Sequence, residues 1–424
     1  MTGRLQLAGR AGWGLADQML SSLTNFGLGV LIARNVSRED FGSFSVAFAS
    51  FLVILNISRA VSTEPFLIRY SAISTDEWRR GARAAAGASL ATGALGTVVC
   101  LVVALLTQGS VQAAFAALAV VLPGLLLQDC WRFAFVARGT PRVTFLVDLA
   151  WALALVPLLL AVEFGTNGVT VVVPLLVWGA SAAFAAVIGA VLAGIMPRPD
   201  LTRVWLRQHT DLVPRFVAEA ITGAGAGQVV ILAVGALVGL KDAGSIRAGQ
   251  LLMGPMQVMF MAVTLIAVPE AVLILRGGVD RLVRACVAIG AAMSLAVIAW
   301  TVLVLMIPDS LGTTLLGPSW IGAREVILPL GLALAGLAAS SGAGIGLRAL
   351  ADARGSLRAR IVDASANVVA GVTGASVGGA PGAAWGLAVG AASGVVAYWV
   401  SFWRSRRRRA ADRATVPPAM PGQP

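Results

Sequence analysis

The sequence predicts an all-α polytopic membrane protein, with about twelve transmembrane helices in two parallel-repeat six-helix lobes around a central cavity and both termini cytoplasmic. Three observations predict this fold. Hydrophobic residues make up 58% of the chain and charged residues only 12%, roughly half of the share of about 25% in soluble domains. Apolar runs of spanning length recur along the chain, and matching strings of residues recur in its two halves.

The composition excludes several classes of protein. A globular surface cannot be covered by so few charges, whereas lipid can contact the remaining apolar surface. The net charge of +12 lies in short clusters between apolar runs, so no nucleic-acid partner is expected. Cys100, Cys130 and Cys286 fall inside apolar runs, and His209 is the single histidine. This pattern predicts no disulfide framework, no metal site and no cofactor.

Each spanning helix needs about 20 mostly apolar residues. In the first half, such runs cover residues 12–33, 42–63, 84–107, 112–136, 143–163 and 168–195. In the second half, they cover residues 213–240, 246–273, 283–307, 324–350, 359–379 and 382–403. The first run contains several polar residues and is longer than the apolar core of a signal peptide, so we interpret it as a retained spanning helix.

The polar segments between the runs define the domains, which are an N-terminal six-helix lobe (1–196), a cytoplasmic linker helix (197–211), a C-terminal six-helix lobe (212–404) and a tail (405–424). Two polar connections, Thr75–Arg83 and Pro199–Asp211, are predicted to form amphipathic helices on the inner membrane surface. The tail is basic and then proline-rich, so we expect it to be disordered and to contact anionic membrane lipids.

The distribution of Lys and Arg predicts the orientation in the cell (inner or plasma) membrane. With the N-terminus in the cytoplasm, the inner segments hold 27 of the 32 Lys and Arg residues. The outer segments hold the other five, which are Arg34, Arg38, Lys241, Arg247 and Arg324. A wrong number of helices would break this alternation part-way along the chain, so the distribution supports twelve spans with both termini inside.

The two halves also share strings of residues. A shift of 202 positions places Asp17 on Glu219, and it places the D-x-G-S string at Asp40 on the same string at Asp242. A shift of 216 positions places Arg132 on Arg348 and the following A-R-G string on a second A-R-G string. Because each half has an even number of helices, both halves start on the same side. The repeat is therefore parallel, with its axis along the membrane normal.

Ionisable groups inside spanning helices cost several kcal/mol unless they are paired or hydrated, so each is a candidate functional residue. Charge at equivalent positions of both halves favours a hydrated central cavity. The candidate substrate-binding residues are Asp17, Gln18, Asn25, Arg59, Arg132, Glu219 and Arg348. For Glu64, Asp148, Glu270 and Asp363, we expect side chains that reach the inner headgroups or pair locally. Asp129 and Arg132, three positions apart on one helix, can neutralise each other.

These residue types suggest a chemistry for the cavity. Guanidinium groups bind phosphate oxygens in a bidentate fork, so arginines near the cytoplasmic end suit an anionic substrate. A nearby carboxylate can take a proton or a sodium ion and couple transport to a gradient. The sequence contains no P-loop, no H-E-x-x-H motif and no nucleophile elbow, so an enzyme is not expected.

Several strings resemble a known family. The stretch from Trp13 to Gln18 and the hairpin from Ala33 to Gly42 resemble the opening of polysaccharide (oligosaccharidyl-lipid) flippases of the Wzx type, which begin with a polar helix and an A-R-x-x-s-x-x-x-F-G hairpin. The L-G-P-S-W string at Leu316 is similar to their loop before helix 10. The G-L-R-A-L string at Gly346, with D-A-R-G-S at Asp352, resembles their helix 10–11 turn.

The resemblance implies membership of the multidrug/oligosaccharidyl-lipid/polysaccharide exporter superfamily and a V-shaped, two-lobed fold. It also implies a flippase that moves a polyprenyl-pyrophosphate-linked oligosaccharide from the cytoplasmic to the outer leaflet, for surface polysaccharide biosynthesis, by ion-coupled alternating access. Polysaccharide assembly proteins are then partners. A multidrug or toxin antiporter of the same superfamily is the alternative, with an acidic cavity for cationic substrates. A membrane-embedded enzyme and a scaffold of a polysaccharide assembly complex are further alternatives.

Overall fold

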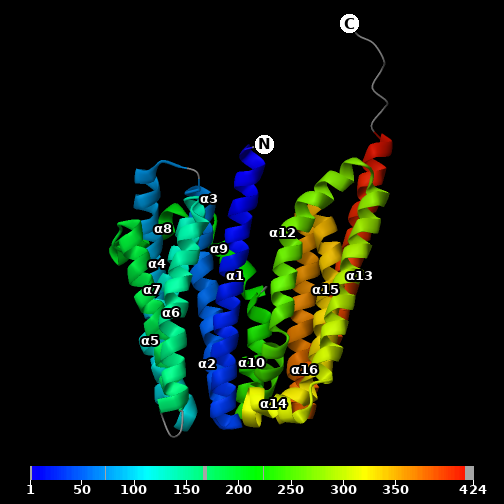
Figure 1. Ribbon diagram of the computed structural model, residues 1–424. Coiled ribbons are helices and arrows are strands. Elements are labelled where there is room, and N and C mark those ends of the chain that lie inside the picture. Colours follow the sequence, from blue (N-terminus) through cyan, green and yellow to red (C-terminus); the bar gives the residue numbers. More distant parts are fainter. Residues whose placement is uncertain (1, 72, 166–169, 223, 416–424) are drawn as a thin grey trace.

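The computed structural model describes residues 2–71, 73–165, 170–222 and 224–415, and this part of the chain folds into two bundles of helices (Figure 1). The first bundle contains α1 (Thr2–Asn35), α2 (Arg38–Ser58), the π-helix η1 (Arg59–Thr63), α3 (Glu64–Arg69), α4 (Thr75–Leu106), α5 (Gly109–Ala137), α6 (Pro141–Gly165) and α7 (Val172–Ala193). A 3₁₀ turn η2 (Pro199–Leu201) and α8 (Thr202–Gln208) then connect it to the second bundle.

The second bundle contains α9 (Val213–Thr222), α10 (Ala224–Leu237), α11 (Leu240–Leu252), α12 (Gly254–Arg276), α13 (Val279–Leu305), α14 (Asp309–Leu316), the 3₁₀ turn η3 (Gly317–Ser319), α15 (Trp320–Ala349) and α16 (Ala353–Thr415). The long α16 consists of two helices that meet at Gly378 and Gly379, where the backbone is not helical. Gly379 has a φ of 60°, a conformation that is open to glycine and strained for other residues.

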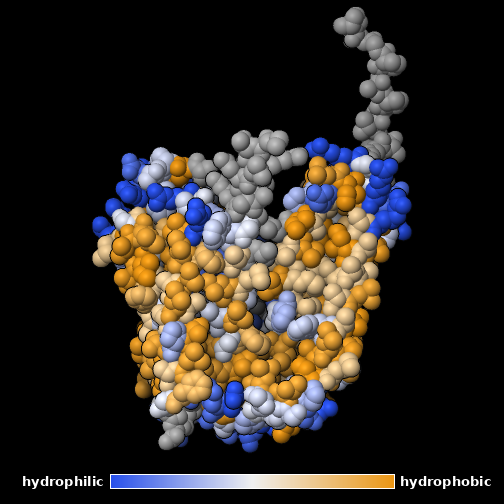
Figure 2. Space-filling model, viewed as in Figure 1, coloured by the Kyte–Doolittle hydropathy of each residue, from blue (hydrophilic) through white to orange (hydrophobic). Residues whose placement is uncertain are grey.

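Nine helices of the described residues are long and apolar enough to cross a membrane. Figure 2 shows the matching apolar band between two charged ends of the molecule, and the chain is therefore an all-α, multi-pass membrane protein. The nine include α16 as one helix and exclude the more polar α1 and the short α10. The predicted number of twelve spans stays a prediction, as does the side on which the termini lie. Figure 1 places the start of α1 and the end of α16 at the same end of the bundles.

One predicted surface helix is absent as a separate element. Thr75–Arg83 forms the first turns of α4, which runs without a break to Leu106. Ser74 caps this helix, because its hydroxyl accepts a hydrogen bond from the Glu77 amide at 3.4 Å and donates one to the Glu77 carboxylate at 2.8 Å. This N-terminal cap starts the helix nine residues before the apolar run and leaves no breaker between them. The second predicted surface segment, Pro199–Asp211, does contain a separate short helix, α8.

The two bundles meet at the end opposite the termini, where α2 packs against α10 and α11. A Cβ atom on Gly42 would lie 2.4 Å from the carbonyl carbon of Leu240, and a Cβ on Gly244 would lie 3.1 Å from the Gly42 nitrogen. Arg38 also donates a hydrogen bond across this contact to Ser245, at 3.3 Å. The D-x-G-S strings of the two halves thus pack against each other. At the other end, Figure 2 shows a notch between the bundles.

Candidate functional site

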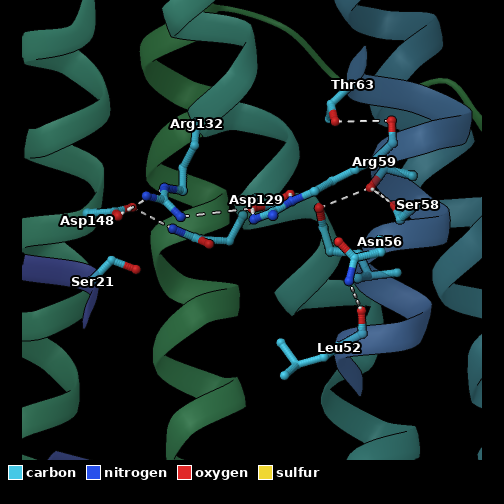
Figure 3. Close-up of polar contacts among 12 residues, drawn as sticks. Ser21, Leu52, Asn56, Ser58, Arg59, Thr63, Asp129, Arg132 and Asp148 are labelled. Atoms are coloured by element: carbon cyan, nitrogen blue, oxygen red, sulfur yellow. Dashed lines mark hydrogen bonds and ion pairs between the residues drawn. The ribbon is translucent and has the colours of Figure 1, made fainter. Parts of the chain in front are cut away.

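Five charged side chains from four segments of the first bundle gather in its interior. Asp17 comes from α1, Arg59 from the π-helix η1, Asp129 and Arg132 from α5, and Asp148 from α6. All five belong to helices that were predicted to carry intramembrane charge. We call them the charge cluster, and Figure 3 labels four of the five, Arg59, Asp129, Arg132 and Asp148.

Arg59 and Asp129 form a bidentate pair. The Arg59 Nε donates to Asp129 Oδ2 at 2.9 Å, and Nη2 donates to Oδ1 at 2.6 Å. The guanidinium also lies 5.2 Å from the centroid of the Phe133 ring. A bidentate, charge-assisted pair fixes both the distance and the orientation of the two groups. Asp129 is buried, so its charge depends on Arg59 for compensation.

Arg132 lies among three carboxylates. Its Nη2 donates to Asp17 Oδ2 at 2.7 Å, and its Nε lies 3.0 Å from Asp148 Oδ2. The second contact is an ion pair whose angle does not permit a hydrogen bond. The third carboxylate, Asp129, lies 3.9 Å from Nη1. Gln128 donates to the other oxygen of Asp148 at 2.7 Å, so the fully buried Asp148 contacts a neutral amide through one oxygen and the Arg132 guanidinium through the other. Figure 3 shows Arg132 and Arg59 on either side of Asp129.

The charge cluster contains more carboxylates than guanidinium groups. With two arginines and three aspartates, it carries one negative charge when every group is ionised. Asp17 Oδ1 and Asp148 Oδ2 are buried without a hydrogen-bond donor among the described residues. A proton on one of these oxygens would remove the excess charge. The described residues contain no group of three or more acidic, His or Cys side chains arranged to hold a metal ion.

The equivalent residues of the second bundle do not form such a cluster. Glu219 pairs with Arg360 at 2.6 Å on an exposed surface, and Arg348 is exposed and has no ion-pair partner among the described residues. The sequence explains the difference. The shift that pairs Asp17 with Glu219 puts Met261 in place of Arg59, and the shift that pairs Arg132 with Arg348 puts Ile345 in place of Asp129. The charges of Arg59 and Asp129 are therefore missing from the second half.

The polar residues of α1 lie beside the cluster. Gln18 donates to Ser22 at 3.2 Å, and Asn25 donates to the Ser21 carbonyl at 2.9 Å. Both side chains are partly exposed. Their hydrogen bonds stay within one turn of α1, so they do not tie this helix to its neighbours.

The remaining intramembrane carboxylates differ in their surroundings. Glu270 is exposed, and Asp363 accepts a hydrogen bond from Asn367 on its own helix at 2.9 Å. The hydrogen bond of Asp363 is the local pairing that was expected for it, whereas the contact of Glu270 with the inner headgroups stays a prediction. Asp148 departs from the expectation, because it is completely buried against Arg132. Its position near the start of the apolar run 143–163 gave no sign of this contact.

Arg247 was counted among the outer-side charges, but the structure places it inside the protein. It belongs to α11, which begins six residues before the predicted apolar run. Its guanidinium lies 4.2 Å from the centroid of Phe48 on α2 of the other bundle. Its Nε is buried and has no hydrogen-bond partner among the described residues. The D-x-G-S string that ends two residues before Arg247 was the sequence signal for an earlier helix start, and so for the position of Arg247 inside the helix.

The fold can be compared with known proteins. The sequence matches no protein-family model and no curated protein. Solved structures do match. A structure described as lipid II flippase MurJ in an inward closed conformation has a TM-score of 0.66 at 10% identity, over 95% of this chain and 93% of that one. The inward-facing conformation of a multidrug resistance MATE family transporter of the MOP superfamily has a TM-score of 0.64 at 14% identity, over 93% and 96%.

An outward-facing structure of a MATE family transporter matches less closely, with a TM-score of 0.52 at 15% identity, over 97% of this chain and 96% of that one. At these identities the likeness concerns the fold. The fold includes the two helical bundles in their order along nearly the whole chain. The chain is thus a multi-pass membrane protein with the fold of these MATE and MurJ structures.

Proposed function

We propose that this protein is a flippase that carries a polyprenyl-pyrophosphate-linked oligosaccharide from the cytoplasmic to the outer leaflet by alternating access. The observation that supports the proposal is the position of Arg247 between the two bundles. A cation held between the two bundles, with a buried Nε that lacks an acceptor among the described residues, costs free energy unless an anion meets it. A substrate pyrophosphate can supply this anion, because guanidinium binds phosphate oxygens with charge-assisted hydrogen bonds.

Two further features support a transport cycle. The bundles touch through the backbones of Gly42 and Gly244 at one end and leave a notch at the other (Figure 2). The chain also matches the inward-facing MATE structure better than the outward-facing one. This arrangement suits a cavity that opens to the inner leaflet before the bundles rock. Arg348, exposed and without an ion-pair partner among the described residues, is a second cation for the substrate.

The charge cluster is the proposed coupling site. Its arginines are already paired with aspartates, so their role is to hold the carboxylates and not to bind pyrophosphate. The excess carboxylate can take a proton or a sodium ion, and neutralisation would weaken the hold of Arg132 on Asp148. Binding of the ion would then change how α1, α5 and α6 pack, because each of these helices contributes a carboxylate.

The test uses purified protein in proteoliposomes with a fluorescent undecaprenyl-pyrophosphate disaccharide as the probe. Dithionite added outside measures the fraction of probe in the outer leaflet. We expect flipping by the wild type and at least about a tenfold loss with Arg247→Gln, because a charged hydrogen bond contributes about 1.5–3 kcal/mol. Arg348→Ala should lower the rate as well. Arg354→Ala, which removes an exposed arginine outside the helix that carries Arg348, is the matched control and should flip normally.

A multidrug antiporter is the second candidate, and the negative charge of the cluster favours it. An antiporter would transport ethidium out of proteoliposomes when a proton gradient is imposed. Ethidium transport that depends on Asp17, together with no movement of the pyrophosphate probe, would overturn the flippase proposal. Transport of the pyrophosphate probe that is unaffected by Arg247→Gln would keep the flippase and reject the proposed anion site.

A further inference from the structure

The linker between the bundles makes an unexpected contact with the segment that carries Arg59. The indole nitrogen of Trp205, on α8, donates a hydrogen bond to the backbone carbonyl of Val61 at 2.9 Å. Trp205 is almost completely buried. Val61 lies in the π-helix η1, two residues after Arg59. A residue outside both six-helix lobes therefore touches the backbone next to the charge cluster.

The sequence explains why the Val61 carbonyl needs a donor. In an α-helix this oxygen accepts a bond from the amide four residues later. That residue is Pro65, which has no N–H group. The helix widens here, and the Glu64 amide bonds to the Arg59 carbonyl five residues back. A buried carbonyl without a donor is costly. The Trp205 indole supplies the bond that Pro65 cannot make.

The same π-helix directs Arg59. A π-helical turn holds one extra residue, so it rotates the side chains before it relative to those after it. In the wild type this rotation presents Arg59 to Asp129 with the bidentate distances of 2.6 and 2.9 Å. Figure 3 shows the Arg59 side chain leaving its helix toward Asp129, with the Thr63 hydroxyl bonded to the Arg59 carbonyl. The orientation of Arg59 thus depends on the widened turn.

Trp205 is itself held in place by the linker. The His209 ring stacks on it at 3.9 Å between centroids and bonds to its carbonyl through Nδ1 at 2.8 Å. The ring of Tyr70, at the end of α3, stacks on the Trp205 ring with 5.8 Å between their centroids. Arg69 pairs with Asp211 at 2.8 Å. The linker is therefore fixed to the end of α3 at two points, Tyr70 on Trp205 and Arg69 on Asp211.

We infer that Trp205 is a positioning residue for Arg59: its indole holds the π-helix open and so keeps Arg59 on Asp129. This inference deepens the proposed function, since Arg59 belongs to the proposed coupling site. It also connects that site to the linker between the moving bundles. Loss of the indole N–H lets the turn relax, and the Arg59 guanidinium then loses its bidentate geometry.

The chain offers a closely matched control. Trp300 donates its indole N–H to the Leu252 carbonyl, also at 2.9 Å, at the break between α11 and α12 in the other bundle. Trp205→Phe and Trp300→Phe each remove one indole–carbonyl bond beside a helix break and keep an aromatic ring. Only Trp205 lies next to the charge cluster.

The experiment combines each Phe variant with Asp129→Asn and measures the midpoint of thermal unfolding in detergent. If Trp205 positions Arg59, Asp129→Asn lowers the midpoint less in the Trp205→Phe background than in the wild type, because the pair is already weakened. The changes in the unfolding midpoint caused by Trp300→Phe and by Asp129→Asn should add up in their double variant. Additive shifts for Trp205→Phe as well would mean that Trp205 is only structural and would overturn the inference.

A second measurement uses single variants only, so it tests the inference when a double variant fails to fold. Hydrogen exchange of peptides that span residues 56–70 should be roughly fivefold faster in Trp205→Phe alone, as expected for the loss of one hydrogen bond, and unchanged in Trp300→Phe. Unchanged exchange in Trp205→Phe would contradict the inference. Neither measurement needs a substrate, so both outcomes are separate from the fate of the flippase proposal.

Discussion

Gly42 and Gly244, 202 positions apart in the sequence, pack backbone against backbone where the two halves of the protein meet. A Cβ on Gly244 would lie 3.1 Å from the Gly42 nitrogen and 3.2 Å from its Cα. Equivalent residues of a parallel repeat that touch each other lie on the axis that relates the halves. This contact closes one end of the molecule, and the proposed alternating-access cycle would have to break it.

Gly42→Ala should prevent this contact from closing. The added methyl group would overlap the backbone at Leu240, which cannot move aside as a side chain can. We expect a lower midpoint of thermal unfolding. Labelling of Ser319→Cys by an impermeant maleimide should also be faster, because Ser319 is buried in the same contact and bonds to the Ala33 carbonyl.

The control for this variant is Gly27→Ala. Gly27 lies inside α1, and its added Cβ meets nothing within 4 Å. Alanine in a helix is favoured over glycine by about 0.5–1 kcal/mol, so this substitution should raise the midpoint slightly. If Gly42→Ala also raised the unfolding midpoint, the bundles would not need the close approach of Gly42 to Leu240.

The two repeat-equivalent aspartates at the start of α2 and α11, Asp40 and Asp242, should differ in importance. Asp242 accepts a hydrogen bond from the buried Ala380 amide at 2.6 Å and so fixes the break within α16. Among the described residues, the Asp40 carboxylate bonds only to the nearby Ser37, on an exposed surface. Asp242→Ala leaves a buried N–H without an acceptor, at a cost of about 1–3 kcal/mol. Asp40→Ala should cost less than about 0.5 kcal/mol. Chemical or thermal unfolding of both variants checks this, and equal losses would contradict it.

Arg132 and Asp148 should not be equivalent in the charge cluster. Arg132→Met leaves three carboxylates near one another without their shared cation, and removal of one member of a buried ion pair costs about 3–5 kcal/mol. Asp148→Asn leaves two arginines with two aspartates and keeps the oxygen to which Gln128 donates. Its cost should stay below about 1.5 kcal/mol. Unfolding midpoints of the two variants test the order, and a greater loss with Asp148→Asn would refute it.

His209 makes stability depend on pH. Burial lowers the pKa of His209 below its ordinary value of 6.5, so the unfolded chain binds a proton more readily than the folded one. The contribution of neutral His209 to the free energy of unfolding is therefore complete above about pH 6.5. It decreases as the pH falls through that value toward the pKa of the folded state. Since His209 is the single histidine, the test compares unfolding midpoints of the wild type and His209→Gln from about pH 7.5 to 5. Parallel curves for the two proteins would contradict this account.

The sequence by itself determined that this protein lies in a membrane, roughly where its helices run, and that its halves are related. These properties follow from sums over many residues. Hydropathy over a span of about 20 residues and the counts of Lys and Arg between spans do not depend on how the helices turn against one another. The match between the two D-x-G-S strings could also be found in the sequence alone. Their direct contact could not. The start of α4 was misplaced because the N-cap at Ser74 lies outside any apolar run.

Only the tertiary structure decided which charges meet. Asp17 and Arg132 are 115 positions apart, and their contact depends on the rotation and tilt of α1 and α5, which the sequence pattern does not specify. The packing of α6 buries Asp148 and that of α15 leaves Arg348 exposed, although both lie in apolar helices. Arg247 and Trp205 owe their positions to contacts with α2 and η1. A charge in a membrane helix is stable only where packing supplies its partner, and packing is a property of the whole fold.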